Sequence, residues 1–157
     1  MTAKADFTDQ EWKTVLEGPP SAGMIVMTAA HGGTFKETFA IGKAYAEARQ
    51  QHGESELLDE IVAAKPEIDH TRYHSPEELR GHGLEHIRDA VAVLERKAQA
   101  DELEDYRRFV LALAAKVAEA HREHGVAVSD QERAALKEIS TSLGDSGDVS
   151  STAEPAP

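Results

Sequence analysis

The amino-acid sequence predicts an all-α fold, a single compact bundle of about seven helices with two pseudo-symmetric halves. Three observations support this prediction. Apolar residues recur at three- and four-residue spacing along most of the chain, and runs of alternating β-branched residues between hairpin turns are nearly absent. A helix–turn–helix pattern occurs twice. Finally, 157 residues with 40% hydrophobic content are enough for one core and too few for two.

Each copy of the repeated pattern consists of an apolar stretch, a His-Gly pair, and a Ser or Thr with Glu three residues later. Glycine ends a helix at little cost because it adopts the left-handed conformation, and the hydroxyl and the glutamate form a capping box that begins the next helix. Each copy therefore predicts a helix, a tight turn and a second helix. The two copies contain His31, Gly32, Thr34 and Glu37, and then His124, Gly125, Ser129 and Glu132.

The first half is expected to hold four helices. The first covers residues 8–17, because Thr8 and Glu11 have capping-box spacing, and Gly18-Pro19-Pro20 predicts its end. The second, residues 21–30, is apolar on most sides and should lie in the middle of the fold. The third covers about 35–51, and the fourth covers about 54–65 and stops before a proline.

The second half is expected to hold three helices after a connecting loop at residues 66–74. Ser75-Pro76 followed by two glutamates predicts a helix over about 75–98. A long helix over 101–124 and a last helix over 130–143, ended by Gly144, follow. Residues 145–157 are small, polar and acidic, so we expect a helical domain over 1–144 and a disordered tail. The expected inward-facing residues are Leu84, Ile87, Val91 and Leu94, and then Leu103, Tyr106, Val110, Leu113 and Val117.

The charge and composition narrow the classes of partner. The net charge of −12 disfavours nucleic acid, because an acidic surface repels phosphate backbones. No apolar run is long enough for a membrane span or a signal peptide, so direct membrane insertion is not expected. The chain has no cysteine, which excludes disulfides and thiolate sites and favours a reducing cytoplasm.

The doubled hairpin, together with the segment His124 to Ile139, resembles the TerB-like family, which is associated with tellurite resistance. The resemblance implies a bundle of two related halves and a non-catalytic protein that acts in stress or metal-oxyanion resistance through contacts with a protein partner. It also implies a divalent-cation site near the two turns. Where the family has Asp-Gly this chain has His-Gly, so only the glutamates carry over cleanly. The implied cation site comprises His31, Glu37, His124 and Glu132.

Histidines supply an alternative, a metal-dependent enzyme or metal-binding protein. His82 and His86 are one helical turn apart, a spacing that lets two imidazoles converge on one cation, and His74 and His121 are further candidate ligands. The metalloprotease signature is absent, because Gly83 follows the first of the pair. Nucleotide-binding, serine-hydrolase and di-iron motifs are absent too. The sequence therefore favours a protein without enzymatic activity over an enzyme.

Simpler structural explanations exist for several of these residues. A histidine before a helix-ending glycine complements the helix dipole, which accounts for His31 and His124 without ligation. Gly81 and Gly83 lie inside an expected helix, where each costs about 1 kcal/mol relative to alanine. Such glycines often mark close approach of another segment, and a neighbouring helix is the favoured explanation here.

Overall fold

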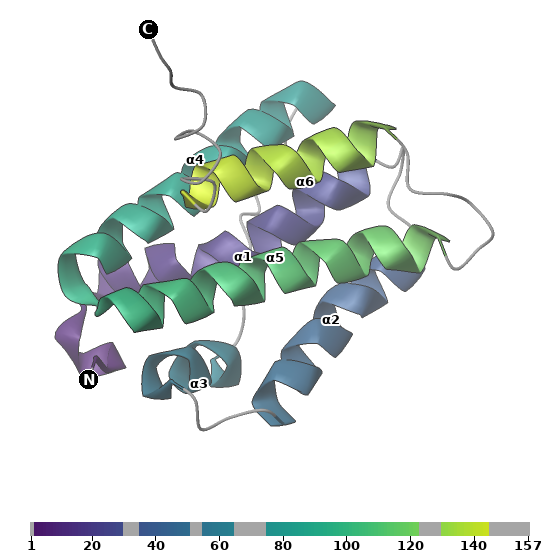
Figure 1. Cartoon of the computed structure of the whole chain (residues 1–157). Helices are drawn as coiled ribbons and strands as arrows, with labels where there is room; N and C mark the ends of the chain where they lie inside the picture. The colour runs from purple at the N-terminus through teal and green to yellow at the C-terminus, as the bar shows by residue number, and fades with distance from the viewer. Residues whose placement is uncertain (1, 30–34, 51–54, 65–74, 123–129, 145–157) are drawn as a thin grey trace, which may run out of the picture.

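The computed structural model describes residues 2–29, 35–50, 55–64, 75–122 and 130–144 (Figure 1). Within these ranges the chain forms one short 3-10 helix and six α-helices, and no strand. The prediction of an all-α fold is therefore confirmed. The expected tail, residues 145–157, lies outside the described ranges. The helices are α1 (Asp9–Ala29), α2 (Phe35–Gln50), α3 (Glu56–Ala63), α4 (Pro76–Lys97), α5 (Ala100–Arg122) and α6 (Asp130–Leu143).

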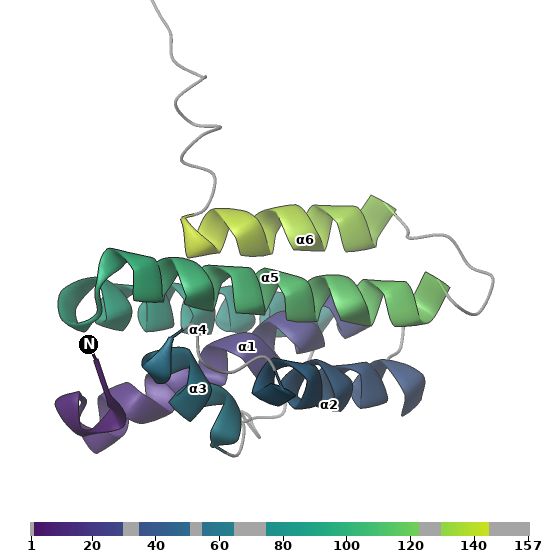
Figure 2. The ribbon, with the colours of Figure 1, turned by 60° about the horizontal axis from the view of Figure 1, so that its bottom comes forward.

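Helix α1 lies at the centre of the bundle. It packs most extensively against α4 and α5 and also contacts α6 and α2. Figure 2 shows α6 on one side of the α4–α5 pair and α2 with α3 on the other. No described helix is both long and apolar enough to cross a bilayer. The inward-facing residues expected for the two long helices of the second half are buried, except Leu84, which is partly buried; the most completely buried include Ile87, Leu94, Tyr106 and Leu113.

The expected end of the first helix at Gly18-Pro19-Pro20 was wrong. Helix α1 continues through both prolines, so the two short helices expected there are one. Pro19 has no N–H to donate to the carbonyl of Val15, four residues earlier. The hydroxyl of Tyr106, from α5, donates a hydrogen bond to that carbonyl at 2.7 Å instead. Gly18 provides the space, because a Cβ there would overlap the Tyr106 hydroxyl.

The expected helix start at Ser75 and the expected helix end at Gly144 are confirmed. Ser75 accepts a hydrogen bond from the Glu78 N–H at 3.1 Å and begins α4. Ser55 does the same for α3 through the Leu58 N–H. Gly144, with φ of +78°, ends α6 in the left-handed conformation. The guanidinium of Arg107 donates a hydrogen bond to the carbonyl of Leu143, so α5 helps to cap the end of α6.

Glu11 joins the start of α1 to the end of α4. Its Oε1 accepts a hydrogen bond from the Thr8 N–H at 2.9 Å, and the Thr8 hydroxyl accepts one from the Glu11 N–H, which confirms the expected capping box. The same carboxylate lies 2.9 Å from the Lys97 ammonium and 3.6 Å from Arg96. The Thr8 backbone hydrogen bond, followed by the contact with Lys97, lowers the pKa of Glu11 to about 2.

The lowered pKa makes folding dependent on pH. Because the folded state favours the ionised carboxylate, its contribution to the free energy of unfolding is present above pH 4.5 and is lost as the pH falls towards 2. Glu11→Gln keeps an oxygen for the capping box and removes the charge. We expect this variant to lose less stability than the wild type between pH 6 and pH 3 in urea unfolding. If both lose stability equally over that interval, the ionic contacts of Glu11 do not contribute.

The ends of the two hairpins meet at one end of the molecule. Figures 1 and 2 both show the end of α1, the start of α2, the end of α5 and the start of α6 at the right of the bundle. These are the described helix ends that border the two His-Gly segments. Residues 30–34 and 123–129, which form those segments, lie outside the described ranges. The described helix ends that border the two sequence repeats therefore lie at the same end of the bundle.

Candidate functional site

The residues of the expected cation site are only partly described. His31 and His124 lie outside the described ranges. Glu37 lies in the first turn of α2, but the position of its side chain is not among those described. Glu132 is described completely and lies in the first turn of α6. The grouping of these four residues into one site stays a prediction.

Glu132 is buried completely, with a side chain that exposes 0% of its surface. Its helix packs over α4, α1 and α5, and α6 begins at the end of the bundle where the two hairpin ends lie (Figure 1). A carboxylate near a helix N-terminus is stabilised by the helix dipole and can cap the first turn. Removing a carboxylate from water is costly, so a buried glutamate indicates a specific structural or ligand-binding role.

The paired histidines of α4 face different surroundings. His82 has an imidazole that is 53% exposed, and its Nδ1 lies 3.8 Å from a carboxylate oxygen of Glu85. His86 is 24% exposed, and its Nδ1 lies 3.6 Å from Oε1 of Glu17, on α1. His86 is therefore partly buried. The contact with Glu17 places His86 at the α1–α4 interface.

The alternative metal site does not assemble among the described side chains. His74 lies outside the described ranges, and the side chain of His121, near the end of α5, is also not described. Among the side chains that the structure places, no group of three histidines, cysteines or acidic residues could hold a metal ion. The wider histidine cluster stays a prediction that depends on His74 and His121.

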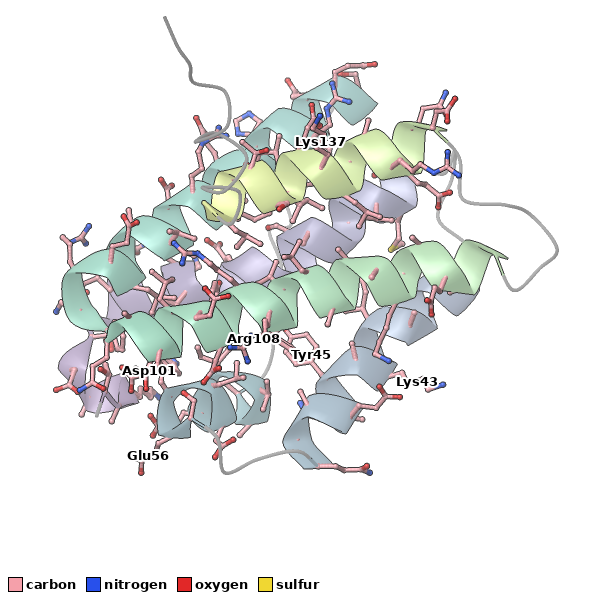
Figure 3. The ribbon with its side chains drawn as sticks, in the orientation of Figure 1. Lys43, Tyr45, Glu56, Asp101, Arg108 and Lys137 are labelled. Carbon is pink, nitrogen blue, oxygen red and sulfur yellow. The ribbon has the colours of Figure 1, made fainter. Side chains whose placement is uncertain are left out.

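A cleft between α2, α3 and α5 was missed by the sequence analysis. Its volume is about 310 Å³. Figure 3 shows Arg108 extending from α5 towards α3 at this place, with Tyr45 of α2 lying nearby against α5. Small residues at the helix surfaces make the hollow, a signal that is recognisable only once these helices are known to be neighbours. The described lining consists of Ala44, Glu47, Ala48, Ser55, Leu58, Asp59, Asp105, Arg108, Phe109, Ala112, Leu113 and Lys116.

The rim of this cleft is charged. The ammonium of Lys116 lies 2.6 Å from Oε1 of Glu47, which joins α5 to α2. This hydrogen bond is the main cause of a lowered pKa for Glu47, so the carboxylate is ionised at neutral pH. At the other end, Nη1 of Arg108 lies 3.3 Å from Oδ1 of Asp105. The cleft thus combines an apolar floor with ionised groups around its opening.

Two tyrosines, Tyr45 and Tyr106, are buried in the core. Tyr45 packs edge-on against Phe109, with ring centroids 5.3 Å apart. Burial raises the pKa of Tyr45, and burial likewise raises the pKa of Tyr106. Because a raised pKa keeps a phenol protonated, neither side chain can act as a base near neutral pH. Their roles are packing and, for Tyr106, hydrogen-bond donation.

Comparison with known proteins identifies no relative: no family model, no curated protein and no solved structure matches this chain. Its function is therefore inferred from its own residues and their geometry.

Proposed function

We propose that this chain is a non-catalytic, cytoplasmic helical protein of the TerB-like type, which acts in stress or metal-oxyanion resistance by binding a protein partner. In this proposal the hairpins α1–α2 and α5–α6 are the repeated units of the two related halves. The observation that carries it is the meeting of both hairpin ends at one end of the bundle (Figures 1 and 2). Equivalent positions in two related halves would then border one shared site.

A divalent cation at this end would join the halves. The proposed ligands are His31 and Glu37 from the first repeat and His124 and Glu132 from the second. The complete burial of Glu132 supports the proposal, because a bound cation would offset the cost of removing a carboxylate from water. Two imidazoles with two carboxylates suit Zn²⁺ or Mn²⁺ better than Ca²⁺, which prefers oxygen ligands alone.

Calorimetric titration of the whole chain with Zn²⁺ and Mn²⁺ tests the site. We expect one ion per chain, and we expect Glu132→Gln and Glu37→Gln each to weaken binding by at least about tenfold, because each removes one ligand. Glu138→Gln is the matched control. It lies on the same helix as Glu132, and its carboxylate is 3.5 Å from Arg80, so the variant should bind as the wild type does.

Three results would contradict this site. One is the absence of binding to the wild type, and another is undiminished binding to Glu132→Gln. The third is loss of binding in His86→Ala with retention in Glu132→Gln, which would favour the histidine cluster instead. Circular dichroism and thermal unfolding of each variant separate loss of the ligand from loss of the fold.

A further inference from the structure

We propose that the cleft between α2, α3 and α5 binds an elongated organic cation, an amine with an apolar body. This binding site is separate from the proposed cation site at the hairpin ends. Three properties of the described lining support the proposal: its size and shape, its apolar floor and the sign of its charge.

The size of the cleft fits a small molecule better than a protein surface. A volume of about 310 Å³ lies at the lower end of the range for ligand pockets. Along α5 the lining extends from Asp105 to Lys116, a distance of about 16 Å at 1.5 Å per residue. The volume is therefore spread along a narrow channel. An extended chain or a ring with a short tail fits this shape.

The floor of the channel is apolar, and its depth comes from alanines. Phe109 and Leu113 of α5 are buried, and Leu58 of α3 is partly buried. Ala44 and Ala48 lie one turn apart on α2, so their side chains leave open the space that longer residues would fill. The floor can cover the hydrocarbon part of a ligand, and the ring of Phe109 adds an aromatic surface that attracts cations.

The sign of the charge favours a cation. Three carboxylates line the cleft, those of Glu47, Asp59 and Asp105, against two cationic side chains. Both cationic groups, Lys116 and Arg108, lie within 4 Å of a lining carboxylate. The described rim is therefore negative on balance, within a chain whose net charge is −12. A cleft lined mainly by one sign of charge concentrates ions of the opposite sign.

Helix α3 forms one wall of the cleft, so ligand binding depends on how firmly α3 packs against the bundle. This helix has eight residues, too few to be stable alone in water. Ser55 caps its start, and the guanidinium of Arg49 donates a hydrogen bond at 2.7 Å to the Val62 carbonyl near its end. Ligand contacts with Leu58 and Asp59 would add to these, so an occupied cleft should hold α3 more firmly against α5.

The test uses the whole chain and three probes of similar length, which are hexylammonium, hexanoate and hexan-1-ol. Binding is followed by nuclear magnetic resonance, through the methyl signals of Ala44, Ala48 and Ala112. We expect hexylammonium to bind at least about tenfold more tightly than hexanoate, because a carboxylate would face the three lining carboxylates. Added salt should weaken the binding of hexylammonium, since the rim charges are partly exposed.

Variants locate the probe. Ala112→Leu and Ala48→Leu fill the channel and should weaken binding of hexylammonium at least about tenfold, because the substituted side chain occupies the ligand volume. Ala115→Leu and Ala46→Leu are matched controls, since both alanines are exposed, lie on the same two helices and are outside the lining. Asp59→Asn should weaken binding about threefold to tenfold through the loss of one charge.

The outcomes separate the alternatives. Failure of hexylammonium to bind, or equal binding by hexanoate or hexan-1-ol, would overturn the proposal. Binding that persists in both filled variants would place the probe elsewhere and would overturn it as well. If a lysine-rich amphipathic peptide shifts the same methyl signals while hexylammonium does not, the cleft is a protein-docking groove and the small-ligand proposal is wrong. None of these results depends on metal binding at the hairpin ends.

Discussion

Replacing Gly18 by alanine should lower the free energy of unfolding by about 3 kcal/mol, the largest effect that we expect from a single added methyl group in this chain. The added Cβ would overlap the hydroxyl of Tyr106 and would also lie 3.4 Å from the Cβ of Ala90. Tyr106 would then have to withdraw from the carbonyl of Val15. The variant would combine crowding in the core with an unsatisfied buried carbonyl. Urea unfolding followed by circular dichroism measures the loss.

Tyr106→Phe separates the two causes. It removes the hydroxyl without crowding, and because Pro19 cannot donate to the Val15 carbonyl, we expect a loss of about 2 kcal/mol. In the double variant with Gly18→Ala, the atom that the Cβ would overlap is absent, so the combined loss should be smaller than the sum by more than about 1 kcal/mol. Additive losses would show that the hydroxyl and Gly18 are not coupled.

Gly83→Ala and Gly81→Ala should change stability in opposite directions, although the two glycines are two residues apart on α4. A Cβ at Gly83 would lie 2.9 Å from Cδ1 and 3.0 Å from Cγ1 of Ile25, a buried residue of α1. The side chain of Ile25 would have to shift, and we expect a loss of about 1–2 kcal/mol, the crowding being offset in part by the better helix propensity of alanine.

At Gly81 no atom of the described residues lies within 4 Å of an added Cβ, and the residue is exposed. Alanine there should raise the free energy of unfolding by about 0.5–1 kcal/mol through helix propensity and the smaller entropy of the unfolded chain. Chemical unfolding of both variants at the same pH measures the contrast. Equal gains at both positions would mean that α4 does not approach α1 closely at Gly83.

The two glycines show how far a local pattern can predict packing. Both glycines predicted the close approach of another segment, and within the described part of the chain such an approach is found at Gly83 and not at Gly81. The capping patterns at Thr8, Ser75 and Gly144 were reliable, because each involves residues within one turn of one another. The break at Gly18-Pro19-Pro20 was wrong because the group that compensates for Pro19 comes from a distant helix.

The two candidate sites also differ in how far the sequence predicts them. The repeated turn pattern predicted two hairpins, and the described helices have the order and ends that such hairpins need. Whether His31, Glu37, His124 and Glu132 converge stays a prediction, since Glu132 alone has a described side chain. The cleft had no sequence signature. Its lining comes from three helices. The alanines on two of these helices indicate a cleft only once it is known that the helices lie against each other.

The hydrogen bond from Tyr106 to Val15 also affects the order in which the helices fold while the chain is synthesised on the ribosome. The donor is 91 positions further along the chain than the acceptor. Until that later portion has emerged, the proline-containing middle of the nascent first helix lacks its stabilising donor and should remain frayed. The amino-terminal hairpin, synthesised first, would therefore wait for its partner, so premature termination upstream of residue 106 should yield a product that proteases degrade quickly.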